Sequence, residues 1–191
     1  GITQITLEDI AYAENWGGVI KLIGCAKQLD DGKLFIMVSP ALIEKNSQLA
    51  SIEDVFNGIL VRGDATGDVV FYGKGAGKLP TASAVVADVI DAVKAPSTRA
   101  SLSWVDSSEN YVVDHTEVPL KFYLRCEVGN IAAVKEALMD RFGVVEYLAR
   151  SGMPVNELGF VLGPVSEKEL DQAIAQIDGI KVLSKNRIMD Y

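Results

Sequence analysis

Residues 58–90 read GILVRGDATGDVVFYGKGAGKLPTASAVVADVI, and this stretch decides the predicted fold. The β-branched and aromatic side chains of 59–61 and 69–72 are typical of two strands, and the glycines and aspartates of 63–68 supply the turn between them. Glycines then alternate with other residues across 73–77, so the backbone there is nearly bare. The pattern predicts a hairpin and then a glycine-rich loop where a ligand can reach backbone N–H groups.

The helix after the glycine loop is the clearest in the chain. Pro80 fits its first turn, where a missing N–H costs nothing. The apolar residues that follow have helical spacing and form one stripe, which we expect to be buried on a sheet: Ala82, Val85, Val86, Val89, Ile90 and Val93.

Composition narrows the classes of function. The 191 residues are 49% hydrophobic and 23% charged, as in a globular protein, and the net charge of −8 disfavours nucleic-acid binding. No apolar run approaches the roughly 20 residues of a membrane span. Cys25 and Cys126 are expected to be free thiols in a reducing cytoplasm. His115 is the single histidine, in a polar run, so we expect no metal site and no role for it in catalysis.

The first 57 residues predict a helix and two strands. Thr6 to Asp9 has the form of a capping box before a helix that ends at Gly17-Gly18. Strands at 19–27 and 33–39 flank a hairpin turn, and Pro40 is expected to end the second. With the two strands predicted at 59–61 and 69–72, residues 19–72 contain four strand candidates joined by turns, which favours antiparallel pairing. The opening Gly-Ile-Thr is expected to be the cut end of a longer chain.

The C-terminal part has a regular order of elements. Asn130 and Ser166 are predicted to cap two amphipathic helices. Together with strands at 120–128, 144–149, 157–163 and 180–189 they give a β-α-β-β-α-β order, the ferredoxin-like pattern of an antiparallel sheet with two helices on one face.

The predicted fold class is therefore α+β. An antiparallel or mixed sheet covered by helices precedes the ferredoxin-like unit. The weak, polar pattern after Ala95-Pro96 predicts a boundary, which divides the chain into a domain at 1–96, a linker at 97–117 and a second domain at 118–191.

Two nucleotide-binding motifs fail on spacing in the glycine loop. A phosphate loop needs four residues between its glycines and then Gly-Lys-Ser/Thr, whereas Gly73 and Gly77 are closer and Lys78 precedes Leu79. The dinucleotide fingerprint GxGxxG also differs from the spacing found here. Spacing alone leaves two interpretations open: a loop that binds a ligand, or a turn that lets a helix pack closely on a strand.

The run 63–91 closely resembles homoserine dehydrogenase. In that family a Gly-Asp-Ala-x-Gly turn leads through a strand into Tyr-Gly-Pro-Gly-Ala-Gly and then Pro-Thr-Ala-Ser-Ala-Val-Val-x-Asp. The opening GITQITLEDIAYAENWGGVIKLIGCAK is also similar to the family, and Lys74 departs from it by replacing proline. The positions that match in the first motif are Asp64, Ala65, Gly67, Tyr72, Gly73, Gly75, Ala76, Gly77, Pro80, Thr81, Ala82 and Asp88.

The resemblance implies an NAD- or NADP-dependent oxidoreductase that interconverts aspartate 4-semialdehyde and homoserine, on the route to threonine and methionine. It implies that the Rossmann domain and the catalytic residues lie upstream of this chain. The chain would then be the end of the catalytic and dimerisation domain plus a regulatory domain, inactive by itself and without a tightly bound cofactor. Gly75, Ala76 and Gly77 would be the remaining cofactor contacts, through their backbone.

The C-terminal unit resembles an ACT domain, which many homoserine dehydrogenases carry. Such domains often bind an amino acid at the loop after the first strand, usually Asp-x-Pro-Gly-Val, where this chain has Gly129, Asn130 and Ile131 after Glu127-Val128. The alternative function is thus a non-enzymatic module for amino-acid binding or oligomerisation. In either case we expect a homo-oligomer, because strands severed from a partner domain leave exposed edges.

Overall fold

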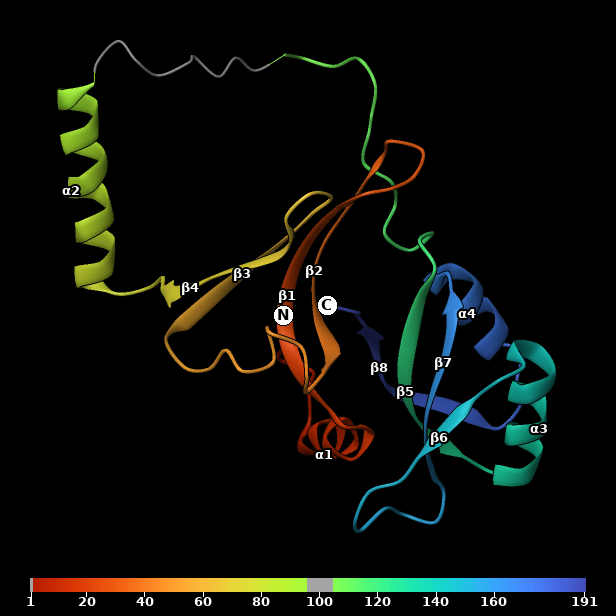
Figure 1. Ribbon diagram of the computed structural model, residues 1–191. Coiled ribbons are helices and arrows are strands. Elements are labelled where there is room, and N and C mark those ends of the chain that lie inside the picture. Colours follow the sequence, from red (N-terminus) through yellow and green to blue (C-terminus); the bar gives the residue numbers. More distant parts are fainter. Residues whose placement is uncertain (1, 96–104) are drawn as a thin grey trace. The chain divides into compact units, whose positions relative to one another are not determined.

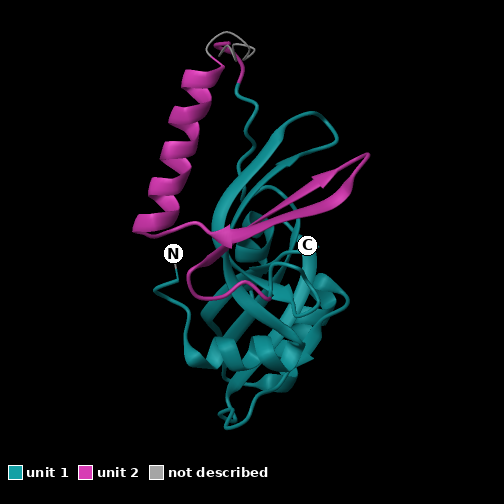
Figure 2. Cartoon of the chain, turned by 60° about the vertical axis from the view of Figure 1, so that its left-hand side comes forward, with its two compact units in different colours: residues 1–50, 110–191 teal, residues 51–109 magenta. Residues whose placement is uncertain are grey.

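The computed structural model describes residues 2–95 and 105–191, which form two compact units (Figure 2). Unit 1 joins residues 1–50 to residues 110–191, and unit 2 spans residues 51–109. Among the described residues, no helix is long and apolar enough to cross a membrane.

Unit 1 is built on a six-stranded sheet in the order β1-β2-β8-β5-β7-β6 (Figure 1). All neighbours are antiparallel except β2 and β8, which pair in parallel at Ala41–Arg187 and Leu42–Ile188. The strands are β1 (Gly18–Gln28), β2 (Leu34–Glu44), β5 (Leu120–Val128), β6 (Glu146–Leu148), β7 (Glu157–Val165) and β8 (Ile180–Ile188).

Helices cover both faces of this sheet. Helices α3 (Ile131–Phe142) and α4 (Glu167–Ile174) lie on one face, where Leu138 and Leu170 are fully buried against alternate residues of β5 and β7. Helix α1 (Leu7–Trp16) covers the other face, with Tyr12 packed among Leu42, Tyr123, Val161 and Ile188. Because side chains alternate across a strand, β5 serves one core with its even residues and the other with its odd residues.

Local capping signals are confirmed. Thr6 and Asp9 form the predicted capping box of α1, and Gly17 ends the helix in the left-handed conformation at φ 91°. Asn130 caps α3 through its side chain, and Ser166 forms the capping box of α4. These ends form where the sequence places them because each cap satisfies backbone groups within a few residues.

The predicted α+β class and the β-α-β-β-α-β order are confirmed, and the sheet extends further than expected. Strands β1 and β2 continue the sheet of the C-terminal unit at β8, and Arg187 Nη1 donates a hydrogen bond to Ser39 Oγ at 2.9 Å across this junction. The division at 97–117 stays a prediction, since part of the linker lies in 96–104, outside the described residues. In packing terms, residues 2–50 share one unit with the C-terminal part.

The prediction that Pro40 ends its strand is wrong. Strand β2 continues to Glu44, and Pro40 lies opposite Leu22 of β1. Pairing with β8 involves only Ala41 and Leu42. One side of β2 is therefore an open edge at Pro40, where a residue without an N–H is tolerated.

Unit 2 contains a hairpin and one long helix. Strands β3 (Phe56–Gly63) and β4 (Gly67–Lys74) pair as predicted, and α2 (Lys78–Lys94) begins just before Pro80. The expected burial of the α2 stripe is wrong for this chain, because no residue of α2 is buried and Val89 is 58% exposed. Periodicity identifies an apolar face, but burial requires a partner surface, and no described element of unit 2 covers it.

Candidate functional site

The Gly75-Ala76-Gly77 turn connects β4 to α2 and is exposed. A Cβ on Gly75 would lie 2.6 Å from Asn57 Nδ2, and Gly77 has φ 117°, so both positions favour glycine. Gly77 is the N-cap of α2 and provides no side-chain cap. The first N–H groups of α2 therefore have no side-chain acceptor at the N-cap. At the end of β4, Lys74 Nζ lies 5.7 Å from the centroid of the Phe56 ring.

The Gly129-Asn130-Ile131 loop lies between β5 and α3. The N–H of Gly129 donates to the carbonyl of Gly179 at 2.9 Å. Asn130 Oδ1 accepts from the N–H groups of Ala132 at 3.1 Å and Ala133 at 3.2 Å. Ile131 packs against the core between the sheet and α3. The hydrogen bonds of Gly129 and Asn130 thus stabilise the loop itself, and Asn130 caps the N-terminus of α3.

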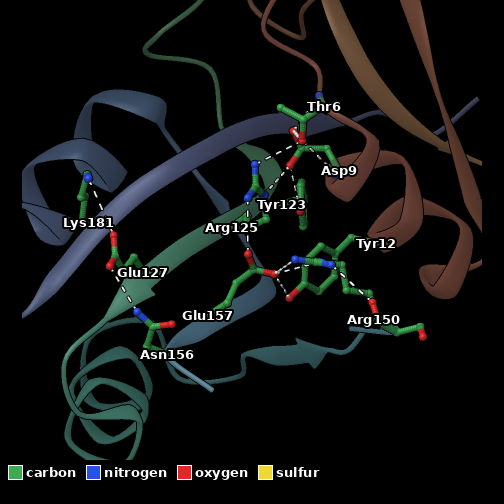
Figure 3. Close-up of polar contacts among 11 residues, drawn as sticks. Thr6, Asp9, Tyr12, Tyr123, Arg125, Glu127, Arg150, Asn156, Glu157 and Lys181 are labelled. Carbon is green, nitrogen blue, oxygen red and sulfur yellow. Dashed lines mark hydrogen bonds and ion pairs between the residues drawn. The ribbon is translucent and has the colours of Figure 1, made fainter. Parts of the chain in front are cut away.

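A buried polar cluster lies between α1 and the sheet and contains two carboxylates, of which the first is Asp9 (Figure 3). Asp9 is fully buried, and its Oδ1 accepts hydrogen bonds from Arg125 Nε at 2.9 Å and from the Tyr123 hydroxyl at 3.2 Å. Its Oδ2 accepts from the N–H and the hydroxyl of Thr6, both at 3.1 Å. One carboxylate therefore completes the capping box of α1 and also binds β5.

Glu157, at the start of β7, is the second centre of the cluster. Its Oε1 accepts from the Tyr12 hydroxyl at 3.1 Å and from Arg150 Nε at 2.9 Å, and its Oε2 accepts from Arg125 Nη1 at 3.4 Å. The charges balance, because two carboxylates meet two guanidinium groups. Every one of these four side chains is largely buried. Buried charges are tolerated only with such pairing.

The surroundings of Arg125, Tyr12 and Tyr123 raise the pKa of each of these groups. Burial lowers the pKa of Arg125, but the hydrogen bond and charge of Asp9 outweigh burial and raise it. Burial and the neighbouring Glu157 raise the pKa of Tyr12 to about 12, and burial with Asp9 raises that of Tyr123. A general acid or base works best with a pKa near the working pH. The shifts move these three groups away from that range, and their hydrogen bonds join α1 to β5 and β7.

The two cysteines and the histidine lie in environments of different exposure. Cys25 and Cys126 are free, as predicted, and burial raises the pKa of the Cys126 thiol to about 12. His115 is exposed beside Asp114. Within the described ranges 2–95 and 105–191, no group of three or more metal-ligating side chains occurs.

A hollow of about 340 Å³ lies at the C-terminal end of α1. Its lining residues are Trp16, Gly17, Glu44, Lys45 and Asn46, and none of these is a predicted site residue.

Sequence reasoning missed the polar cluster. The available signals were Arg125 inside an otherwise apolar strand segment and Glu157 at the head of another. Each signal indicates a buried charge that needs a partner. Nothing in the sequence names Asp9 as that partner, because the two residues are 116 positions apart.

Comparison with known proteins finds homoserine dehydrogenases. A family model described as homoserine dehydrogenase matches residues 1–90, the range that contains α1, both hairpins and the glycine turn. The chain is 43% identical over 197 residues to the homoserine dehydrogenase of Bacillus subtilis, with 97% of this chain and 45% of the relative covered. The chain is therefore similar to homoserine dehydrogenases along nearly its whole length.

Further relatives agree on the family and on the share of its length. The homoserine dehydrogenase of Synechocystis is 51% identical over 153 residues, which cover 75% of this chain and 35% of that protein. The crystal structure of a homoserine dehydrogenase from Thiobacillus denitrificans superimposes with a TM-score of 0.78 at 30% identity, covering 100% of this chain and 47% of that one. The chain thus spans about half the length of the curated relatives that it matches over nearly its whole length. The resemblance stated from the glycine motif is confirmed.

Proposed function

We propose that this chain is the C-terminal part of a homoserine dehydrogenase, an oxidoreductase that interconverts aspartate 4-semialdehyde and homoserine with NADP or NAD in the cytoplasm. The observation that carries the proposal is the family match over residues 1–90 together with relatives about twice as long. The domain at 118–191 is then a C-terminal module of the same polypeptide, of the ACT-like kind.

In the proposed enzyme, the Gly75-Ala76-Gly77 turn borders the cofactor through its backbone. Two features of the turn fit this role: glycines at positions where a side chain would meet Asn57 (Gly75) or need a positive φ (Gly77), and helix N–H groups without a side-chain cap. The cofactor, when bound, supplies hydride transfer. The contribution of this chain is an open strip of backbone that a planar or anionic group can approach.

The chain by itself is proposed to be inactive. Hydride transfer to an aldehyde needs a held cofactor and a proton donor at the aldehyde oxygen. Around the turn, this chain offers the Asn57 amide and the Lys74 and Lys78 ammonium groups, which form one edge of a site. The test is the ultraviolet absorbance of reduced nicotinamide when the chain is mixed with homoserine and NADP⁺ or NAD⁺. We expect no rate above the blank, and a rate proportional to chain concentration would contradict the proposal.

The chain is also proposed to form a homo-oligomer. Apolar side chains remain exposed on α2 and on one face of the β3–β4 hairpin, where Ile59 and Phe71 lie opposite each other and are 64% and 62% exposed. Such exposure is typical of surfaces that bind protein. Light scattering should give a mass of two or more chains, and a monomer at all concentrations would count against this part of the proposal.

A second candidate function is an amino-acid-binding regulatory module, favoured by the β-α-β-β-α-β arrangement of β5 to β8. Titration calorimetry with threonine and with methionine distinguishes it. A heat of binding that disappears in Gly129→Ala or Asn130→Ala, but persists in the control Gly24→Ala on β1, would support this function. Absence of heat with both amino acids would leave the module without this role.

A further inference from the structure

We propose that the buried cluster of Asp9, Arg125, Arg150 and Glu157 is a coupling element, through which displacements of the C-terminal β-α-β-β-α-β module reach helix α1. The inference goes beyond the proposed activity and does not depend on turnover. It rests on where the cluster lies, on how completely its groups are paired and on what happens when one pair is broken.

The cluster joins two parts of the chain that the family match separates. Asp9 and Tyr12 lie within residues 1–90, which match the family model, whereas Arg125, Arg150 and Glu157 lie beyond that range. Figure 3 shows that the α1 side chains point toward β5 and β7 and meet the basic and acidic groups there. A signal that passes from the module to the family-matched segment therefore has a direct physical route.

Two successive contacts fix α1 on two neighbouring strands. Asp9 and Tyr12 are three residues apart and so share a helix face. Asp9 binds Arg125 of β5 at 2.9 Å, and Tyr12 binds Glu157 of β7 at 3.1 Å. The helix also lies close to the sheet, because a Cβ on Gly159 of β7 would be 2.3 Å from Tyr12 Cε1. Movement of β5 against β7 would thus change both anchors of α1.

Full pairing makes the cluster sensitive to position. Breaking a buried ion pair by removing one partner is strongly destabilising, because it leaves an uncompensated buried charge. In this cluster each carboxylate binds at least one guanidinium group and one hydroxyl group. Any displacement that breaks one pair leaves a charge buried without its partner, so intermediate positions of α1 are disfavoured.

Strand β5 also connects the cluster to the far end of the module. Gly129 lies four residues beyond Arg125, or about 13 Å along an extended strand. The end of β5 is held by bonds from Val128 N–H to Asn156 C=O at 2.8 Å and from Gly129 N–H to Gly179 C=O at 2.9 Å. Asn156 directly precedes Glu157 in the chain, so the hydrogen bond from Val128 connects the end of β5 to a residue next to the cluster.

Amide hydrogen exchange on the 191-residue chain tests the coupling. Arg125→Met removes the central guanidinium group while keeping much of its volume, and we expect exchange in α1 to accelerate by ~100-fold or more. Tyr12→Phe keeps the buried ring and loses one hydrogen bond, so we expect acceleration of ~5-fold, which protects the test if the first variant does not fold. Arg141→Met is the matched control, since Arg141 is exposed on α3 and pairs with Gln176.

Coupling must also work in the reverse direction. Asp9→Asn changes only α1, yet we expect faster exchange in β5 and at the start of β7 as well. Three results would overturn the proposal. They are wild-type exchange of α1 in both Arg125→Met and Tyr12→Phe, equal acceleration of α1 and α3 in those variants, or an effect of Asp9→Asn that stays within residues 6–16.

Discussion

Gly159→Ala is expected to destabilise unit 1 because Gly159 leaves room for the Tyr12 ring. A Cβ at this position would lie 2.3 Å from Tyr12 Cε1 and 2.6 Å from Tyr12 Cζ, closer than nonbonded carbon atoms can approach. Gly159 is not among the glycines with positive φ, so its backbone conformation suits alanine. The predicted effect is therefore steric, and it acts on the ring that anchors α1 to β7.

The magnitude follows from three contributions. Overpacking a filled core by one methyl group costs about 1–3 kcal/mol. Displacement of the ring also loses the hydrogen bond from Tyr12 to Glu157, worth about 1 kcal/mol. Reduced backbone entropy of the unfolded chain returns about 0.4–1 kcal/mol for a glycine-to-alanine change. The free energy of unfolding should fall by about 2 kcal/mol.

Urea denaturation followed by circular dichroism measures this change. Gly24→Ala is the control, since its Cβ would meet only Val38 Cγ2 at 3.9 Å, an ordinary contact in another strand of the same sheet. A Tyr12→Leu background supplies the second comparison, because a smaller side chain leaves space for the methyl group. The Gly159→Ala cost should shrink by more than half in that background, as expected for residues in contact.

Two results would refute this reasoning. One is a Gly159→Ala protein as stable as Gly24→Ala, within about 0.5 kcal/mol. The other is an unchanged cost in the Tyr12→Leu background, which would show that the ring is not what the methyl group meets.

Three further predictions concern caps, thiols and acid. Asn130→Ala should lower the free energy of unfolding by about 1 kcal/mol in the same denaturation assay, because α3 loses its side-chain cap; no change would contradict the capping role. Iodoacetamide at about pH 8 should modify half-buried Cys25 before buried Cys126, whose pKa of about 12 keeps the thiol protonated, as peptide mass spectrometry will show; faster loss of the Cys126 thiol would oppose this. Burial raises the pKa of Glu167, but its two basic partners on β8 lower it below the ordinary value of 4.5. Its contribution to stability is therefore present above that value and lost as pH falls through the folded pKa. Glu167→Gln should be less stable than wild type at neutral pH and equal to it in acid, and a pH-independent difference would contradict this.

Local patterns were readable from sequence where the chemistry is local. The capping boxes at Thr6 and Ser166 and the cap at Asn130 each involve residues two or three positions apart, and all are confirmed. The β-α-β-β-α-β order followed from periodicity in the same way.

The errors arose where burial depends on distant segments. The stripe of α2 has helical spacing, yet that spacing says nothing about which surface covers it. Pro40 was expected to end its strand because proline is disfavoured in the middle of a sheet. The strand continues because the pairing of β2 with β8 is short and leaves an edge beside Pro40, and β8 lies far along the chain. For the same reason, the union of β2 with β8 and the pairing of Asp9 with Arg125 had no local signal.

For the candidate cofactor turn, the sequence was more informative than the structure. Its glycine motif identified the family directly from sequence, and the family match over residues 1–90 agrees. The structure adds that Gly75 and Gly77 occupy positions where a side chain would be obstructed or strained. Their contact with a cofactor remains a prediction.

The sequence of the reading frame upstream of the Gly1 codon determines whether this chain is the C-terminal part of a longer homoserine dehydrogenase. We predict an in-frame segment of about the length of this chain, with a strand followed by the fingerprint GxGxxG and a helix. A stop codon immediately upstream, or an upstream segment without a dinucleotide-binding fingerprint, would contradict it.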